Sequence, residues 1–294
     1  FGAQTARFVL IECLQRGTEW GNSIYEVELI SSDVCYTPGM GSEDRVEALL
    51  GAMTLSEKTT LLYGQTYMDL HAIPRLGIPS LRLADGPLGI RRDQATAFPA
   101  PIALASSWDV EQVQTTGVAY GQEWINKGRQ VMLGPCIGLV RVPHGGRNFE
   151  TYGEDPFLNG RMATAMVQGV QSQGVIACIK HYACNNQEYN RLTIDIQVDE
   201  RTLREMYLPV FKAAVQDGGA WAVMSAYNRL NGPYCTASAY LQDTILKQEW
   251  GFPGFVVSDW GAVHETVAPA NAGLDLEMDS ASPTGAYWGN GQLY

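Results

Sequence analysis

A carboxylate follows one short apolar segment of this sequence directly. Residues 255–258 read FVVS and lead into Asp259, Trp260 and Gly261. A short apolar run bounded by glycines is typical of a strand buried on both faces of a parallel sheet. Because a charged side chain is rarely buried without a partner, Asp259 is expected to face a cleft or a fixed cation. The alternative is that Asp259 caps the helix that follows, since Asp is a favoured N-cap residue.

Polar residues also follow other apolar segments. They are Asp85 after 78–84, Arg147 in a long glycine-rich stretch after 131–134, Lys180 and His181 after 175–179, and Tyr227 after 221–224. Barrel enzymes place their chemistry at the carboxyl ends of several strands in this way. Each residue alone also has a structural interpretation. Asp85 precedes Gly-Pro and suits a turn, and Arg147 has Glu150 and Glu154 as nearby ion-pair partners.

Helices are expected between these segments. Asp109 is a predicted N-cap of a helix that ends at Gly128, and Asp155 followed by proline predicts the start of another. Asp199 opens a third helix, which Pro209 should bend. The sequence Thr54 to Glu57 has the spacing of a capping box.

The alternation of strands and helices from about residue 80 onward predicts an α/β fold with a parallel sheet. No G-x-G-x-x-G follows the first strand, which disfavours dinucleotide binding. The strand-end residues favour a TIM-type (β/α)8-like barrel. About seven strands are recognisable, the last over 274–278, so the barrel is expected to be irregular or incomplete at its end. Residues 42–294 are assigned to this barrel domain, truncated before closure, and 1–41 to an N-terminal extension of unknown role.

Composition narrows the range of partners. The 294 residues carry a net charge of −11, which disfavours nucleic acid and anionic membranes as partners because both require clustered Lys and Arg. The charge is compatible with a neutral substrate. Seven Trp and 14 Tyr suit the faces of sugars, although such rings also fill ordinary cores.

Other classes of site lack sequence support. The six cysteines show no C-x-x-C spacing, so neither a metal site nor a cofactor is expected. No apolar run approaches the roughly 18 residues of a membrane span. The apolar stretch 7–14 lacks the features of a signal peptide. A secreted, periplasmic or cytoplasmic location, the disulfide state and the oligomeric state all stay open.

Five motifs occur in an order that carries a family resemblance. They are DGPLGIR at 85–91, GGRNFE at 145–150 followed by EDP at 154–156, KHY at 180–182 with NQE at 186–188, MSAYN at 224–228, and SDW at 258–260. Together they resemble the N-terminal barrel domain of glycoside hydrolase family 3, of the β-glucosidase type. The resemblance covers roughly residues 43–290.

The resemblance implies a retaining hydrolase that removes terminal non-reducing β-D-glucosyl residues from a β-glucoside or an oligosaccharide. Asp259 would be the catalytic nucleophile. The implied substrate-binding residues are Asp85, Arg147, Lys180, His181, Tyr227 near the nucleophile, and Trp260 beside the sugar. Arg and Lys side chains nearby are expected to keep both Asp85 and Asp259 ionised.

Retaining hydrolysis also needs an acid/base carboxyl group about 5 Å from the nucleophile. In two-domain relatives it comes from a domain after the barrel, so here it is expected from an absent C-terminal domain or a second chain. Single-domain relatives, the β-N-acetylglucosaminidases, use a His–Asp pair on a loop that here reads YACNNQEYN at 182–190, without His. This polypeptide alone is therefore expected to be an incomplete β-glucosidase. A non-catalytic sugar-binding barrel and a metal-dependent hydrolase built on His144, His181 and Asp259 remain alternatives.

Overall fold

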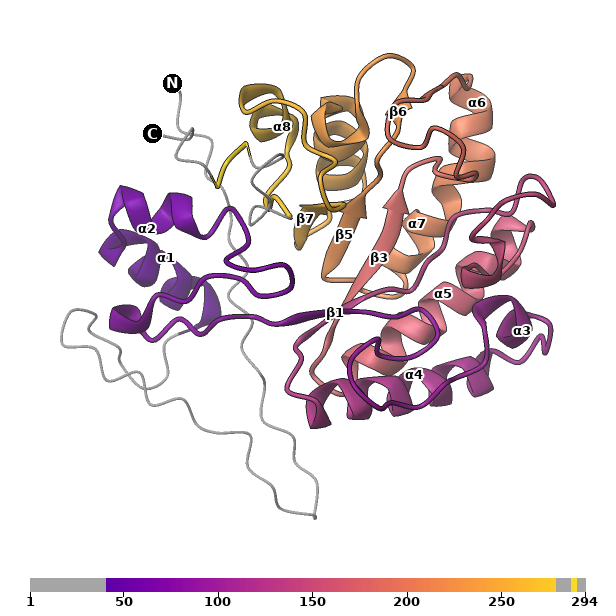
Figure 1. Ribbon diagram of the computed structural model, residues 1–294, viewed down its shortest axis with the longest axis horizontal. Helices are drawn as coiled ribbons and strands as arrows, with labels where there is room; N and C mark the ends of the chain where they lie inside the picture. The colour runs from indigo at the N-terminus through magenta and orange to yellow at the C-terminus, as the bar shows by residue number, and fades with distance from the viewer. Residues whose placement is uncertain (1–40, 279–286, 290–294) are drawn as a thin grey trace.

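The computed structural model describes residues 41–278 and 287–289, so the predicted extension 1–41 lies almost wholly outside the described residues. A five-stranded parallel sheet forms the centre of the molecule, in the order β1-β2-β3-β5-β7 (Figure 1). Its strands are β1 (Leu83–Asp85), β2 (Val131–Leu133), β3 (Ile176–Tyr182), β5 (Ala222–Ser225) and β7 (Phe255–Ser258). Two short strands, β4 (Asp195–Ile196) and β6 (Arg229–Leu230), pair with each other apart from this sheet. The predicted α/β class is confirmed.

Each crossover between neighbouring strands of the sheet contains a helix. The main ones, in chain order, are α4 (Val110–Asn126), α5 (Pro156–Gln171), α7 (Leu208–Gln216) and the π-helix η5 (Tyr240–Glu249). Shorter helices are α1 (Ser42–Ala52), α2 (Leu55–Thr60), η1 (Pro74–Leu76), α3 (Pro101–Ala105), η2 (Asn148–Glu150), α6 (Glu200–Thr202), η3 (Leu203–Tyr207), η4 (Cys235–Ala237) and α8 (Val267–Ala272). Figure 1 shows α4, α5 and α7 along one flank of the sheet and α1 and α2 away from them.

The helix starts follow from side-chain caps. Asp109 accepts a hydrogen bond from Gln112 N at 2.9 Å, and Asp155 accepts one from Leu158 N at 2.7 Å. These contacts satisfy backbone donors that the first helical turn leaves unpaired. The helix that opens after Asp199 passes through η3, a π-helical turn, just before Pro209. Because proline has no N–H to donate, the regular hydrogen-bond ladder cannot continue through it.

Beyond β7 the sheet continues through irregular bridges. Leu276 forms a parallel bridge with Val257, and the next residue, Glu277, donates its N–H to Leu62 O at 2.9 Å. The segment after Leu62 then reaches the first strand, where Leu83 N donates to Met68 O at 2.7 Å. The predicted last strand over 274–278 is thus a bridge and not a regular strand. The hydrogen bonding runs from β7 back to β1, and its irregularity lies where the sequence analysis expected it.

Two apolar cores lie on opposite faces of the strands. In β3, Ala177 and Ile179 belong to the large core shared with the helices, whereas Ile176 and Cys178 belong to a smaller core. The smaller core also contains Leu83, Val131, Leu133, Ala222, Met224, Val257 and Leu276. Each of the five strands thus contributes one or two side chains to it, and Leu276 adds one from the bridge beyond β7. Because side chains alternate along a strand, this smaller core fills the interior of the barrel.

Candidate active site

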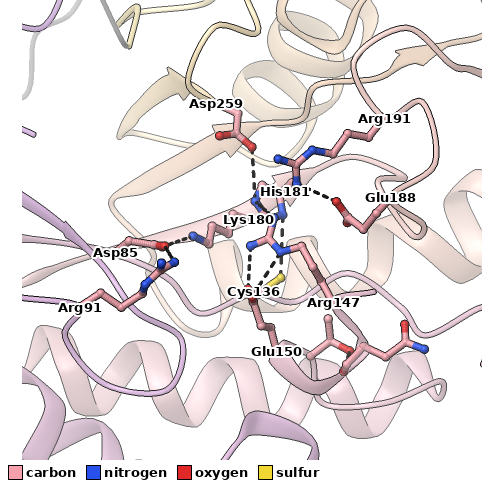
Figure 2. Close-up of polar contacts among 12 residues, drawn as sticks. Asp85, Arg91, Cys136, Arg147, Glu150, Lys180, His181, Glu188, Arg191 and Asp259 are labelled. Carbon is pink, nitrogen blue, oxygen red and sulfur yellow. Dashed lines mark hydrogen bonds and ion pairs between the residues drawn. The ribbon is translucent and has the colours of Figure 1, made fainter. Parts of the chain in front are cut away.

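The period of two along the strands brings three charged residues to one end of the barrel. Asp85, Lys180 and Asp259 each lie two residues beyond an interior side chain, namely Leu83, Cys178 and Val257. Side chains two apart on a strand point to the same face. The three charges therefore cap the interior core at the carboxyl ends of β1, β3 and β7, where Figure 2 shows them facing one another.

Asp85 and Lys180 form an ion pair across β1 and β3. Lys180 Nζ lies 2.5 Å from Asp85 Oδ1, and the exposed Arg91 contacts Asp85 Oδ2 at 2.9 Å. Burial is the largest single influence and works to raise the pKa of Asp85, but the charge and hydrogen bond of Lys180, with the charges of Arg91 and Arg147, together hold that pKa below its usual value. Lys180 is only 3% exposed, and Asp85 raises its pKa although burial opposes this. Both groups are therefore charged near neutral pH.

His181 lies between Arg147 and Asp259. The register between β3 and β5 shifts between Ile179 and Tyr182, which lets His181 join Lys180 at the same end of the barrel. Its Nε2 lies 3.2 Å from Arg147 Nη1 and 3.4 Å from Asp259 Oδ2, and its Nδ1 lies 3.8 Å from Cys136 Sγ. Burial, followed by the Arg147 and Lys180 charges, lowers the pKa of His181 well below its usual value. The imidazole is therefore neutral.

The neighbours of His181 determine which ring nitrogen carries its proton. A guanidinium group has only donors, so His181 Nε2 must accept the hydrogen bond from Arg147 Nη1. The proton of the neutral ring is then assigned to Nδ1, which faces Cys136 Sγ. In this state Nε2 has no proton to give to Asp259.

Asp259 is 7% exposed and holds its carboxylate over the barrel interior. Oδ1 accepts a hydrogen bond from Trp260 N at 2.8 Å. Oδ2 is buried and has no well-formed hydrogen bond to any residue that the structure describes. Burial raises the pKa of Asp259, although Lys180 and the Trp260 N–H act to lower it. Nearby cations thus act to favour the ionised form of both aspartates, as expected, but at Asp259 the effect of burial is larger.

Two aromatic residues flank Asp259. The Tyr227 hydroxyl lies near enough to lower the pKa of Asp259, though its geometry falls short of a regular hydrogen bond. Tyr227 is 8% exposed, and burial raises its pKa. Trp260 donates its Nε1–H to Tyr67 O at 2.8 Å and meets the Tyr67 ring edge-on at 6.0 Å. The segment that closes the barrel therefore fixes the orientation of the Trp260 indole.

Arg147 pairs with Glu150, as the structural interpretation of the sequence allowed. Arg147 Nη2 lies 2.7 Å from Glu150 Oε2, and Nε lies 3.3 Å from Oε1. The same guanidinium also contacts His181, so the ion pair orients Arg147 toward the site (Figure 2). A shallow pocket beside these residues is lined by His181, Arg147, Glu188 and neighbouring loop residues.

All seven predicted site residues thus gather at one end of the barrel, but the sequence analysis missed others that surround them. Arg91, Cys136 and Arg191 contact predicted residues directly, and Glu188 pairs with Arg191. Arg91 and Glu188 lie within the quoted motifs DGPLGIR and NQE, which is a signal that could have identified them. Cys136 lies just beyond β2, where it forms a parallel bridge with Lys180, whereas Arg191 lies in the loop after β3.

The described residues contain neither a metal-type cluster nor a candidate membrane span. Across residues 41–278 and 287–289, no group of three His, Cys, Asp or Glu side chains has an arrangement that suits a metal ion. Within the same residues, no helix combines the length and apolar character that a membrane span requires.

The fold and site define a (β/α)-barrel protein of the enzyme type, with polar groups at the carboxyl ends of its strands. The family described as "Glycosyl hydrolase family 3 N terminal domain" matches residues 46–282. Since this match spans most of the chain, the protein belongs to glycoside hydrolase family 3. The resemblance noted in the sequence is confirmed.

Named relatives agree with this membership. Thermostable β-glucosidase B of Acetivibrio thermocellus is 46% identical over 249 residues, which cover 80% of this chain and 33% of the relative. An exo-α-(1→6)-L-arabinopyranosidase of Bifidobacterium longum is 42% identical over 240 residues, covering 77% of this chain and 32% of the relative. The chain thus spans about a third of the length of the curated relatives it matches.

A solved structure supports the same fold. β-Glucosidase 3B from Thermotoga neapolitana, in complex with glucose, superposes with a TM-score of 0.82 at 42% identity. The match covers 85% of this chain and 39% of that protein. The TIM-type barrel is therefore shown for this chain, as predicted.

Proposed function

We propose that this chain is the nucleophile-bearing barrel of a retaining β-glucosidase, which acts on terminal non-reducing β-D-glucosyl residues. The observation that carries the proposal is the Oδ2 atom of Asp259, buried and without a well-formed hydrogen bond among the described residues. A buried, unpaired carboxylate oxygen lowers stability, so its retention fits a functional group.

In the proposed reaction, Asp259 Oδ2 attacks the anomeric carbon of the bound sugar. The bond from that carbon to the leaving-group oxygen breaks, and the electron pair leaves with the oxygen, which takes a proton from an acid/base group. Water then attacks the anomeric carbon and gives a proton to the same acid/base group, while the bond from that carbon to Asp259 breaks, which releases the sugar and restores the Asp259 carboxylate. Because His181 Nε2 already accepts from Arg147, it gives no proton to Asp259 that would weaken the nucleophile.

The charged residues around Asp259 suit the hydroxyl groups of a pyranose. In this proposal Asp85 accepts hydrogen bonds from the sugar, while Lys180 and Arg147 donate to it. Hydrogen bonds with one charged partner are stronger than neutral ones, which helps a neutral ligand displace water. His181, Tyr227 and Trp260 complete the proposed sugar site, with the indole beside the ring.

The proposed acid/base group comes from outside the described residues, in a further domain or a second chain. Two carboxylates near His181, Glu150 and Glu188, are each engaged in an ion pair with an arginine at 2.7 Å. A carboxylate held by arginine favours its charged form and is a poor proton donor. The relatives' greater length is consistent with a further domain.

Glucose is proposed as the sugar because the structurally similar β-glucosidase 3B is described in complex with glucose. The similarity to an arabinopyranosidase provides a contrasting sugar for a specificity test. The two pyranoses differ at the hydroxymethyl group, which arabinopyranose lacks, and in the configuration at C4, so a comparison of glucosides with arabinopyranosides probes the part of the site that faces these two positions.

A trapping experiment tests the nucleophile. Incubation with 2-deoxy-2-fluoro-β-D-glucosyl fluoride should add one fluoroglucosyl group at Asp259, located by peptide mass spectrometry, because fluoride leaves without acid assistance. Asp259→Asn should take up no label, whereas Asp85→Asn should still be labelled at Asp259, but more slowly. A label on any other residue would contradict the assignment.

Two further results separate the alternative functions. Glucose binding by calorimetry without any covalent label would identify a non-catalytic sugar-binding barrel. Loss of labelling in the presence of a chelator would identify a metal-dependent enzyme. The proposal expects labelling that a chelator leaves unchanged.

A further inference from the structure

Arg191 lies beside the proposed nucleophile without touching it. Its guanidinium carbon is 4.7 Å from the centre of the Tyr227 ring, and its Nη1 lies 2.7 Å from Glu188 Oε2. Figure 2 shows this ion pair close to His181 and Asp259. Arg191 and Glu188 come from the loop after β3, whereas Tyr227 and Asp259 follow β5 and β7. One loop therefore packs a cation against the ring next to the nucleophile.

The contact with Arg191 restricts the position of the Tyr227 phenol ring. A guanidinium over an aromatic face is attracted to the ring's electrons and restricts the ring's movement. Glu188 in turn fixes Arg191 through the ion pair, and its side chain packs over Gly146, the neighbour of Arg147. Glu188 thus pairs with Arg191, and its charge acts on Arg147 as well.

We propose that Arg191 is a positioning residue, which holds the Tyr227 hydroxyl toward the Asp259 carboxylate and so favours the ionised nucleophile. This inference rests on the proposed role of Asp259. A phenol under a cation is a stronger hydrogen-bond donor, and donation to a carboxylate favours its charged form. Arg191 does not contact the sugar or the reacting atoms in this proposal.

The electrostatics of the surroundings agree with this geometry. The Arg191 charge acts to lower the pKa of Tyr227, which burial raises. Tyr227 in turn acts to lower the pKa of Asp259. The other groups that face Asp259 are Lys180, Arg147, the neutral His181 and the buried thiol of Cys178. The Arg191 charge also acts on His181, but the ring that its guanidinium covers is that of Tyr227.

The test is the pH dependence of covalent trapping. The rate constant for labelling of Asp259 by 2-deoxy-2-fluoro-β-D-glucosyl fluoride should rise with pH as the carboxylate ionises. In Arg191→Met the rising limb should move up by roughly half to one pH unit, with labelling about three- to tenfold slower on that limb. Above the limb both proteins hold Asp259 ionised, so their rates should converge. Arg191→Lys keeps the charge without the planar group and should fall between them.

The matched control is Arg201→Met. Arg201 also pairs with a glutamate, Glu205, at 3.0 Å, but it is exposed on α6. Its variant should have the wild-type pH profile. Glu188→Gln, which weakens the Arg191 ion pair, should shift the limb in the same direction by a smaller amount and serves if Arg191→Met does not fold.

The outcomes separate this inference from the proposed function. Labelling of Asp259 with an unmoved limb in the Arg191 and Glu188 variants would overturn the inference alone. A loss of rate by the same factor at every pH would also overturn it, because that indicates only a structural role. If the wild-type label appears on another residue, the function and the inference both fall.

Discussion

The pKa values of two aspartates at one end of the same barrel are shifted in opposite directions. Asp85 has the Lys180 and Arg91 partners, which hold its pKa below the usual value despite burial. Among the residues that the structure describes, Asp259 has no such ion pair with a lysine or arginine, and burial raises its pKa. The difference arises from contact, because Lys180 touches Asp85 and acts on Asp259 only from a distance. Environment, and not residue type, therefore separates the proposed binding carboxylate from the proposed nucleophile.

This difference predicts opposite effects of amide substitution on stability. Because the folded protein raises the pKa of Asp259, the contribution of this group is most favourable at low pH and is lost as pH rises through the folded pKa. Asp259→Asn should therefore stabilise the fold at pH 8 by about 1 kcal/mol, or roughly 2–4 °C in Tm, and by less at pH 4. Thermal unfolding followed by circular dichroism at the two pH values measures this.

Asp85→Asn is the matched control, with the opposite sign. The folded-state pKa of Asp85 is depressed, so its stabilisation is present above the unfolded pKa and is lost as pH falls through the folded value. At pH 8 the substitution should cost about 2 kcal/mol, because it leaves the Lys180 charge buried with weaker compensation. If both variants lose stability at pH 8, the charged Asp259 carboxylate does not destabilise the fold, and the prediction is contradicted.

At the scale of elements, the barrel wall depends on a close approach of α4 and α5. A Cβ added to Gly169 would lie 2.3 Å from Gln114 O and 2.9 Å from Gly117 Cα, both on α4. These distances are too short for any real contact, so the two helix backbones meet at glycine because no larger residue fits. The helices in turn cover the outer face of β2 and β3, which carry site residues at their ends.

At Gly169, helix propensity and packing should change the free energy of unfolding in opposite directions. Alanine favours a helix over glycine by about 1 kcal/mol. Nevertheless Gly169→Ala should lower the free energy of unfolding by about 2 kcal/mol, since overpacking forces α4 and α5 apart. Gly51→Ala on α1, where nothing lies within 4 Å of the new methyl group, should raise it by roughly 0.5 kcal/mol. Urea unfolding measures both changes, and a neutral Gly169→Ala would contradict the packing argument.

The sequence predicted the elements best where one local rule decides them. The caps at Asp109 and Asp155 and the apolar runs of β3 and β7 are confirmed. The segment 274–278 has a strand's alternation but forms only a bridge, because its partners on either side are short and irregular. The π-helices η3 and η5 were not predicted, since a single inserted residue leaves the apolar period almost unchanged.

The candidate site shows the same limit. The residues at strand ends, such as Asp85, Lys180 and Asp259, followed from the period of two and the family's motifs. Cys136 was missed although it lies just beyond β2 and bridges to Lys180. Arg191 was missed because it reaches the site from a loop whose course no local pattern fixes. Contacts between loops depend on how the whole barrel places the strands that carry them. Short stretches of sequence do not contain this information.

At the scale of the whole molecule, one buried carboxylate joins the end of the described chain to the barrel. Glu277 is 1% exposed. Its Oε1 accepts from Tyr287 N at 2.7 Å and its Oε2 from Trp288 N at 2.6 Å. The backbone of Glu277 meanwhile bridges to Leu62 and Gly64, where the ring of hydrogen bonds continues toward β1. Burial raises the pKa of Glu277, and these N–H groups partly oppose that rise.

Glu277→Ala should therefore loosen the closure of the barrel. It leaves two buried backbone donors without their acceptor and opens space beside Trp288, so the free energy of unfolding should fall by about 3 kcal/mol. Hydrogen exchange should accelerate at the Tyr287 and Trp288 amides more than at β3. Glu277→Gln keeps the size and one acceptor, so it should lose less stability and expose one amide more than the other. Uniform acceleration across β3 and residues 287–288 would show that Glu277 supports the core generally and does not specifically hold the last segment against the barrel.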